Sequence, residues 1–441
     1  MSTVSTATTD EAVDTAVAEA RARYVARCPR SAAIQAEAAK VLPGGNTRSV
    51  LWFAPFPLRI ARGWDSILED VDGHRYVDFL GEYTAGLFGH SNPVIREAIT
   101  SVLADGLSFG ANNVYEASLA AAITSRFASM ELLRFTNSGT EANLMAVALA
   151  RVATGRDDVL VFRGAYHGGL MSFAKGNAPT NAPYSFVIGQ YNDVEGTRRL
   201  IDEHGPALAA VLFEPMLGSA GCIPATPEFL SVLRDGATRH GALLIADEVM
   251  TSRLSSGGAQ ARFGLLPDLT TLGKYFGGGL SFGAFGGRRD LMSRFDPSTP
   301  DALAHAGTFN NNVLSMAAGH AALTKVLTPA VLDALNQRGD RLRHSLNLTF
   351  AAAGAPFSAT GIGSLLNVHA TDAPVSSPAD LAAADDRWKE ILFFDLLERG
   401  YYMARRGFMA LSLAITDAQV DGLIDAVGAV LSDRAALWTR G

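Results

Sequence analysis

The feature that most constrains the fold is an alternation, starting near residue 132, of short apolar runs with amphipathic segments of helix length. A strand that is buried on both faces is a continuous apolar run, and strands that alternate with helices are typical of a mainly parallel sheet covered by helices. Ligands of such folds bind beyond the carboxyl ends of the strands. We therefore expect the chemistry of this chain just after the runs, which span residues 132–135, 159–162, 209–213, 242–246 and 269–272.

The segments on either side of this region divide the chain into three predicted parts. Residues 1–79 are predicted to form an N-terminal arm of two helices and a hairpin that turns at Asp72-Gly73, and to pack with the C-terminal part. Residues 80–326 form the large domain, with the parallel sheet. Residues 327–441 combine helices with short strands and form a smaller α+β domain. The predicted fold class is α/β, with this smaller domain added.

Composition excludes several classes of function. The net charge is -7 and no block of Lys and Arg occurs, so nucleic acid is not an expected partner. Two distant cysteines, Cys28 and Cys222, indicate a reducing compartment rather than a disulfide framework. No segment has the roughly 20 apolar residues that span a bilayer, and residues 1–28 lack the apolar stretch of a signal peptide. We expect a soluble, cytoplasmic protein without a metal, because no His/Asp/Glu set has ligand spacing.

Three of the apolar runs end in residues that suit catalysis. Residues 136–142 are small or polar at a strand-to-helix turn, where free N–H groups and the helix dipole favour a phosphate. Asp247 and Lys274 follow two other runs, and Lys274 lies among apolar residues and glycines, which favour a neutral, nucleophilic amine. Each feature alone has an ordinary explanation: a helix cap, a structural acid or a solvated lysine. Together they match pyridoxal phosphate, which needs a Schiff-base lysine, a phosphate cup and an anion beside its pyridine nitrogen.

The same segments resemble the class III aminotransferases in order and spacing, over nearly the whole chain. The resemblance implies an aspartate-aminotransferase-type fold and a homodimer whose active sites lie at the subunit interface. It rests on Asn137-Ser138-Gly139-Thr140-Glu141-Ala142, Ala165-Tyr166-His167-Gly168, Glu214-Pro215, Asp247-Glu248-Val249-Met250-Thr251, residues 267–274 and Gly307-Thr308-Phe309.

The resemblance also implies roles for individual residues. Lys274 would bind the cofactor and move the substrate proton, and Asp247 would pair with the pyridine nitrogen. Tyr166 and Val249 would pack on the two faces of the ring, and Thr308 would reach the phosphate from the partner subunit. His167, His90 and His305 are expected to be structural. The remaining cofactor residues implied by the motifs are Ser138, Gly139 and Thr140, which would hold the phosphate, and Glu214.

Two groups within the family are similar to this chain: the glutamate-1-semialdehyde aminomutases and the aminotransferases of aromatic β-amino acids such as β-phenylalanine. Residues 48–57, residues 82–86 and Ser252-Arg253 resemble the second group, which we favour. The expected reaction moves an amino group from an aromatic β-amino acid to 2-oxoglutarate or pyruvate. The aminomutase and a non-catalytic pyridoxal phosphate binder are the alternatives, and the acceptor and the preferred enantiomer stay open.

A pocket for these substrates needs a carboxylate clamp and an apolar wall. A guanidinium matches a carboxylate with two parallel hydrogen bonds, so Arg48 and either Arg405 or Arg406 are the clamp candidates. The resemblance favours Arg48 and Arg405, whereas Arg406 is closer to an ordinary surface arginine. Tyr83 and Met250 are expected to line the apolar wall, together with Trp52, Phe53 and Phe88.

Overall fold

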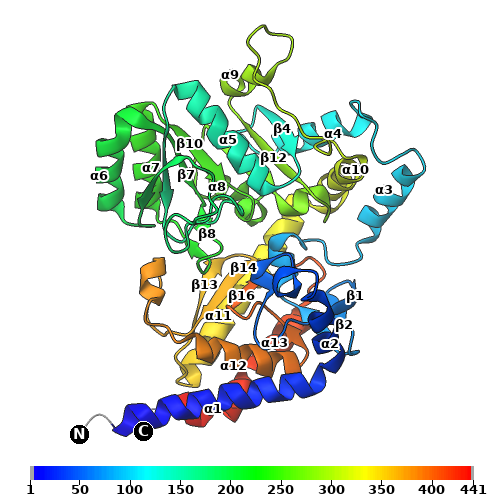
Figure 1. Ribbon diagram of the computed structural model, residues 1–441, viewed down its shortest axis with the longest axis vertical. Coiled ribbons are helices and arrows are strands. Elements are labelled where there is room, and N and C mark those ends of the chain that lie inside the picture. Colours follow the sequence, from blue (N-terminus) through cyan, green and yellow to red (C-terminus); the bar gives the residue numbers. More distant parts are fainter. Residues whose placement is uncertain (1–3, 439–441) are drawn as a thin grey trace.

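The centre of the molecule is a seven-stranded sheet in the order β4-β12-β11-β10-β7-β5-β6 (Figure 1). The computed structural model describes residues 4–438. Six of the strands are parallel, and β12 is antiparallel to both of its neighbours. The predicted mainly parallel sheet is confirmed. Its strands are β4 (Leu132–Thr136), β5 (Asp158–Phe162), β6 (Ser185–Gly189), β7 (Leu208–Phe213), β10 (Leu243–Asp247), β11 (Leu269–Gly273) and β12 (Gly283–Gly287).

Helices cover this sheet and complete the large layer in the upper half of Figure 1. α5 packs across β11 and β12, α7 packs on β7 and β10, and α6 packs on α7. α3 and α4 both pack on α10. Their bounds are α3 (Pro93–Leu103), α4 (Val114–Thr124), α5 (Gly139–Thr154), α6 (Val194–His204), α7 (Pro227–His240), α8 (Gly258–Arg262), α9 (Arg289–Met292) and α10 (Val313–Ala321), with the short pair β8 (Met216–Leu217) and β9 (Ile223–Pro224) beside them.

The lower half of the molecule combines both ends of the chain (Figure 1). In one sheet, β3 of the N-terminal hairpin pairs in parallel with β15 of the C-terminal part. The division of the chain at residues 79 and 326 stays a prediction. The elements are α1 (Val4–Arg27), α2 (Pro29–Ala38), β1 (Ile60–Trp64), β2 (Ile67–Asp70), β3 (Arg75–Asp78), α11 (Pro329–Ala352), β13 (Ser358–Ile362), β14 (Leu365–His369), α12 (Asp386–Glu398), β15 (Tyr401–Tyr402), β16 (Phe408–Ala410), α13 (Asp417–Asp433) and α14 (Ala435–Trp438).

The hairpin turn between β2 and β3 differs from the predicted two-residue turn. Gly73 has a positive φ of 94°, but Asp72 does not share this conformation, and the strands close one residue further out, where Asp70 N–H donates to the His74 carbonyl. The Asp72 carboxylate instead accepts hydrogen bonds from the N–H groups of Arg30 and Ser31, at 2.7 and 3.0 Å. The hairpin tip therefore caps the first turn of α2.

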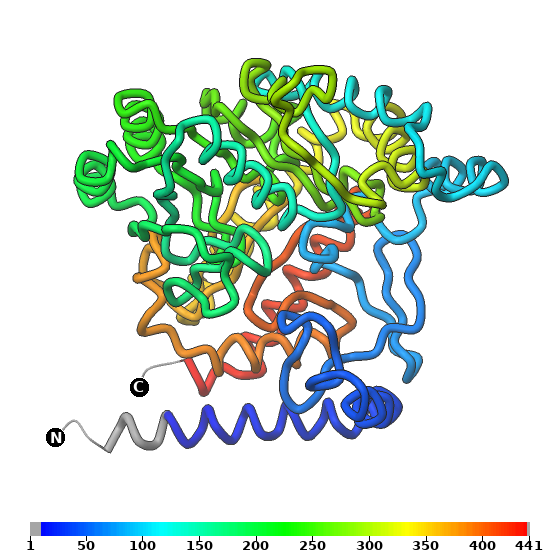
Figure 2. Tube along the Cα trace, turned by 45° about the horizontal axis from the view of Figure 1, so that its top comes forward, coloured from blue at the N-terminus to red at the C-terminus, as the bar shows by residue number. Residues whose placement is uncertain are grey.

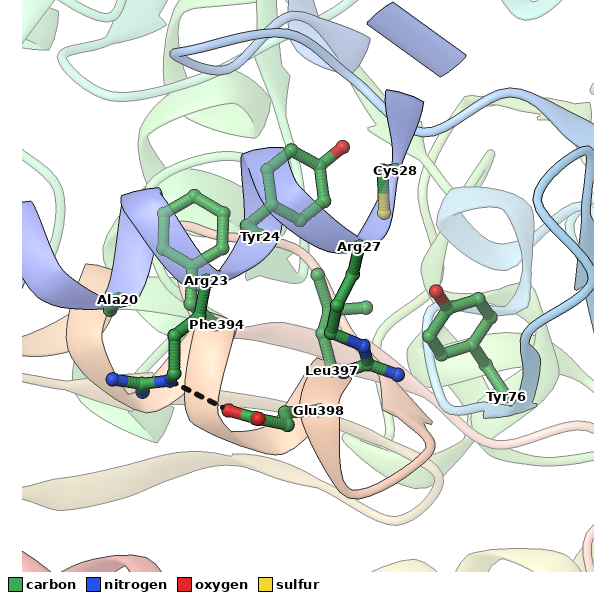
Figure 3. A pocket seen from close by; sticks show the side chains of 9 residues that line it. All are labelled: Ala20, Arg23, Tyr24, Arg27, Cys28, Tyr76, Phe394, Leu397 and Glu398. Carbon is green, nitrogen blue, oxygen red and sulfur yellow. Dashed lines mark hydrogen bonds and ion pairs between the residues drawn. The ribbon is translucent and has the colours of Figure 1, made fainter. Parts of the chain in front are cut away.

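The long helix α1 lies along α12 at the base of the molecule (Figure 2). Arg21 pairs with Glu390 at 2.5 Å, and Arg23 pairs with Asp395 and Glu398. A small cavity between the two helices is lined by Arg23, Tyr24, Cys28 and Glu398, among others, and no predicted site residue borders it (Figure 3). Within residues 4–438, no helix is long and apolar enough to cross a membrane.

Candidate active site

Lys274 stands directly beyond the carboxyl end of β11 and begins a short 3₁₀ turn. Its backbone has a positive φ of 59°, a strained conformation for a residue with a side chain. Burial, followed by the charge of Arg48, lowers the pKa of the Lys274 amine to about 8. Much more of this amine is therefore unprotonated near neutral pH than of a solvated lysine, and the neutral form is the nucleophile.

Asp247 ends the neighbouring strand β10 and is buried. Its Oδ2 accepts hydrogen bonds from Asn143 Nδ2 and His167 Nδ1, each at 2.8 Å, and its Oδ1 accepts one from the N–H of Val249 at 3.0 Å. Asn143 is itself held by the Thr271 hydroxyl at 2.7 Å. Three donors thus fix the carboxylate in one orientation beside the end of β11, the strand that carries Lys274.

The predicted phosphate cup lies at the N-terminus of α5. Ser138 is the N-cap, and its hydroxyl accepts a hydrogen bond from the N–H of Glu141. Gly139 leaves room for a close neighbour, because a Cβ there would lie 2.7 Å from a methyl group of Val249. Thr140 accepts a hydrogen bond from the N–H of Gly169 at 3.3 Å. This helix start lies at the edge of the sheet that carries Lys274 and Asp247, and it can bind an anion.

Tyr166 and Glu214 are linked through the backbone. The Tyr166 N–H donates to Glu214 Oε1 at 2.9 Å, and the N–H of Gly218 donates to Oε2 at 3.0 Å. Burial raises the pKa of the Glu214 carboxyl to about 7, against the lowering effect of these donors. Glu214 thereby fixes the loop that presents Tyr166, whose side chain is exposed.

The turn that contains Thr308 lies beside the phosphate cup. Asn137 Nδ2 donates to Asn310 Oδ1 at 3.0 Å, which ties residues 307–310 to the start of α5. Thr308 itself is exposed, as is Phe309, 60% of whose surface is accessible. The single chain therefore leaves this turn uncovered.

The guanidinium groups of two arginines lie over one tyrosine ring near Lys274. The guanidinium carbons of Arg48 and Arg406 lie 5.7 and 5.4 Å from the centre of the Tyr83 ring, which also stacks on Phe408. Arg406 Nη1 donates to the Ser219 carbonyl and hydroxyl at 2.9 and 3.0 Å. Both arginine charges lower the Lys274 pKa, so both lie near the amine.

The structure corrects the preference for Arg405 over Arg406. Arg405 Nη1 lies 3.3 Å from Glu390 Oε2, on α12, and Glu390 also binds Arg21 of α1. The side chains of Arg405 and Arg406 point in different directions. Arg405 pairs with the buried carboxylate of Glu390, whereas Arg406 binds Ser219. Arg406 is therefore the arginine that faces the site.

The expected apolar wall is formed in part. Tyr83 lies beside both arginines, and Met250 packs near Gly218 and, like Tyr83, against the apolar cluster that includes Phe408. Phe53 does not take part, because it is buried against Tyr24, Phe393 and Phe394. Trp52 is exposed on the molecular surface.

Among residues 4–438, one set of possible metal ligands lies close together: Cys28, Asp70 and His74. Its members already have partners, since Asp70 Oδ2 accepts hydrogen bonds from His74 Nδ1 at 3.0 Å and from the Tyr76 hydroxyl at 2.7 Å. Burial raises the pKa of the Cys28 thiol to about 12, which disfavours the thiolate that binds metals. The absence of a metal stays a prediction.

The residues at this edge of the sheet fit pyridoxal phosphate. The cup at α5, the fixed carboxylate of Asp247 and the amine of Lys274 supply its three requirements. His167 Nε2 is in addition buried without a hydrogen-bond partner in the described part of the chain. When bound, the cofactor supplies an electron sink that stabilises the carbanion formed from an amino acid. Asp247 would stabilise the protonated pyridine nitrogen, and Lys274 would carry the proton.

Fold and site together define a pyridoxal phosphate enzyme, and the chain belongs to the class III aminotransferase family, whose model matches residues 52–431. The chain is 50% identical to the beta-phenylalanine transaminase of Variovorax paradoxus, over 98% of this chain and 99% of that protein. It is 39% identical to the glutamate-1-semialdehyde 2,1-aminomutase of Desulforudis audaxviator, over 90% of this chain and 96% of that protein.

Solved structures agree with this membership. A beta-phenylalanine aminotransferase from Variovorax paradoxus has a TM-score of 0.95 at 50% identity, over 97% of this chain and 100% of that one. A transaminase described with pyridoxal phosphate bound has a TM-score of 0.86 at 33% identity, over 93% of this chain and 99% of that one. The chain is thus a pyridoxal-phosphate-dependent transaminase, which excludes the non-catalytic alternative.

Proposed function

We propose that this transaminase moves the amino group of an aromatic β-amino acid, of the β-phenylalanine type, to 2-oxoglutarate or pyruvate. The observation that carries the proposal is the stack of Arg48, Tyr83 and Arg406 beside Lys274. It places two guanidinium groups, which can bind carboxylates, next to one aromatic ring, and this suits a donor with a ring and a carboxylate. The 50% identity to a beta-phenylalanine transaminase supports the same donor.

We propose the following roles for the individual residues. Lys274 binds the cofactor, and Asp247 holds the charge of its ring nitrogen. Residues 138–140 bind its phosphate, while Tyr166 and Val249 pack on its ring and Glu214 fixes the Tyr166 loop. Arg48 binds the carboxylate of the β-amino acid, and Arg406 binds that of the keto acid. Met250 adds to the apolar wall.

We also propose a homodimer that shares its active sites. Leu103, Leu107, Phe109 and Val114 are exposed, and the segment that holds them lies against residues 309–313, where Asn311 Nδ2 donates to the Ala111 carbonyl at 3.1 Å. With Phe309 these side chains form an apolar surface beside the Thr308 turn. A second copy that covers this surface would bring its own Thr308 to the phosphate.

The glutamate-1-semialdehyde aminomutase reaction is the second candidate, because such an enzyme is 39% identical to this chain. An isomerase returns the amino group to the same carbon skeleton and needs no external keto acid. The Arg406 site favours transfer, since a separate acceptor needs a carboxylate site of its own.

A substrate panel separates the two candidates. Aromatic β-amino acids, α-amino acids and the semialdehyde are each supplied with 2-oxoglutarate, with pyruvate and without an acceptor. We expect keto-acid-dependent deamination of β-phenylalanine and no conversion of the semialdehyde alone. Acceptor-free conversion of the semialdehyde, without turnover of β-amino acids, would contradict the proposal.

A further inference from the structure

Residues 81–84 form a strained turn at the mouth of the site. Gly81, Glu82, Tyr83 and Thr84 all have positive φ, at 53°, 49°, 52° and 82°. Three successive residues with side chains in this region are costly, and such strain is concentrated at functional sites. Packing enforces the turn, because Gly81 lies too close to the Ala410 carbonyl for any side chain. One consequence is the position of Tyr83 beside the two arginines, and the other is the position of Glu82.

Glu82 is the acid of the substrate side of the site. Its side chain is 51% exposed, and its charge raises the pKa of Lys274, as the charge of Asp247 also does. Asp247 is buried and already holds three donors. Around Lys274 the structure therefore offers two guanidinium groups and one accessible carboxylate. A zwitterionic ligand such as an amino acid is complementary to this arrangement, whereas a keto acid lacks the cation.

His90 lies behind Glu82 and is oriented by Asp78. His90 Nδ1 is 3.8 Å from Glu82 Oε1, and His90 Nε2 is 2.9 Å from Asp78 Oδ2. The other oxygen of Asp78 accepts hydrogen bonds from the N–H groups of Leu80 and Gly81, at the start of the strained turn. A carboxylate at Nε2 keeps the proton on that nitrogen, so Nδ1 can accept one from the side of Glu82.

We propose that Glu82 binds the ammonium group of the incoming amino donor and accepts a proton from it. This inference rests on the proposed transaminase reaction. One N–H bond of the ammonium breaks, its electron pair stays on nitrogen, and an O–H bond forms at Glu82. The proton then passes to His90 Nδ1 when the exposed Glu82 side chain moves from its present 3.8 Å to hydrogen-bond distance. Asp78 pairs with the imidazolium that results. The donor is left as the free amine, which is the nucleophilic form.

The charged groups around this pair are few. The hydrogen bond to Asp78 has the largest effect on the pKa of His90 and raises it. Burial lowers this pKa, and the charge of Glu82 raises it further. In the β1–β2 turn, the Asp65 carbonyl accepts a hydrogen bond from the backbone N–H of His90 at 2.8 Å. The Asp65 carboxylate accepts one from the Ser91 hydroxyl. The charges of Glu82, Arg48 and Arg406 all act on the Lys274 amine.

The test compares the two half-reactions by following the cofactor spectrum after rapid mixing. At pH 7, Glu82→Gln should lower kcat/KM for the amino donor about 10- to 100-fold, the usual effect of losing a charge-assisted hydrogen bond. The keto acid half-reaction should change less than about twofold, because that substrate has no ammonium group. Raising the pH should reduce the deficit, since more donor is then free amine. Glu82→Asp should recover part of the rate.

Glu131→Gln is the matched control, because the Glu131 side chain is 52% exposed and pairs with Arg289 at 3.6 Å, away from the site residues. It should leave both half-reactions unchanged. An equal loss in both half-reactions of Glu82→Gln, or no loss in either, would overturn the proposal. Failure of wild-type protein to transfer any amino group would instead refute the proposed function.

A second measurement does not depend on turnover. In NMR titrations of the intact protein, Glu82→Gln should lower the pKa of His90, and Glu131→Gln should not. Benzylammonium, used as an ammonium probe, should shift the His90 resonances of the wild type and not those of Glu82→Gln. Equal responses in wild type and Glu82→Gln would overturn the assignment of Glu82 as the ammonium site, whatever the substrate.

Discussion

The environment of Lys274 makes its amine less basic than that of a solvated lysine. Burial and the nearby arginines disfavour the ammonium form, and these effects are strongest when no cofactor is bound. The same environment that makes the amine reactive therefore reduces the stability of the cofactor-free protein. The charged form of Asp247 is instead stabilised, because three hydrogen-bond donors hold its carboxylate.

The loss of stability caused by Lys274 should be measurable in the cofactor-free protein. The Lys274 pKa is about 8 in the folded chain and near 10.5 when unfolded, so between these values the unfolded chain binds more protons. The contribution of Lys274 to the unfolding free energy should therefore rise with pH from 8 to 10.5, by about 3 kcal/mol. Lys274→Met should be more stable than wild type at pH 7 and lose that advantage by pH 10 in urea unfolding. Exposed Lys325→Met is the control, and a pH-independent deficit of Lys274→Met would contradict the account.

Asp247→Asn should bind the cofactor but react slowly. A neutral amide no longer stabilises a protonated pyridine nitrogen, so kcat should fall by roughly 100-fold or more. Steady-state kinetics with the amount of bound cofactor measured in parallel checks this. Asp268→Asn serves as the control, because Asp268 is a buried acid that pairs with Arg234 and Arg288 and should affect stability instead. Near wild-type kcat in Asp247→Asn would refute the role.

At the scale of elements, the segment between β15 and β16 decides which arginine serves the site. Arg405 is bound to Glu390 on α12, and Arg406 is bound to Ser219 in the β8–β9 loop. Neighbouring residues of one short segment thus contact different parts of the molecule.

The two arginines should therefore differ in kinetics. Arg406→Ala should lower kcat/KM for the keto acid about 10- to 100-fold, by loss of a charge-assisted pair with the carboxylate. Arg405→Ala should change it less than about twofold, because Glu390 keeps its partner Arg21 and the site is untouched. Kinetics with each substrate varied separately test the pair. Equal defects in both variants would show that Arg405 also serves the site.

The apolar runs predicted five strands of the central sheet, because buried parallel strands carry continuous apolar sequence. They did not predict β6 or β12, and the sequence of β12, Gly-Ala-Phe-Gly-Gly, has little apolar surface. Its glycines are needed because side chains at Gly283, Gly286 or Gly287 would meet the backbone of neighbouring segments. A close approach of this kind comes from tertiary structure and leaves no periodic signal.

In the active site too, the sequence did not predict the contacts that depend on tertiary structure. Lys274, Asp247 and the cup at residues 138–140 follow strands, so their common edge was predictable. Asn143 was missed, because it lies inside α5 and reaches Asp247 only through the packing of that helix. Arg406 was ranked below Arg405, since only the position of Glu390 on α12 distinguishes them. The one available signal for Arg406 was its place beside an apolar strand, which Arg405 shares.

For the whole molecule, the exposed apolar surface around Phe309 predicts a dimer. Sedimentation should give twice the 46.5 kDa of one chain. Phe309→Asp should shift the equilibrium toward monomer and lower activity with it, because a charge in an apolar interface is costly. A monomeric wild type with full activity would contradict the shared active site.

The most direct test of the account is the chemical trapping of Lys274. Borohydride reduction of the holoprotein, followed by peptide mass spectrometry, should find the pyridoxyl phosphate group on Lys274. Prior incubation with β-phenylalanine and no keto acid should abolish this adduct, because the amino group then resides on the cofactor and frees the lysine. Adding keto acid should restore it. An adduct on another lysine, or one that β-phenylalanine leaves unchanged, would contradict the account.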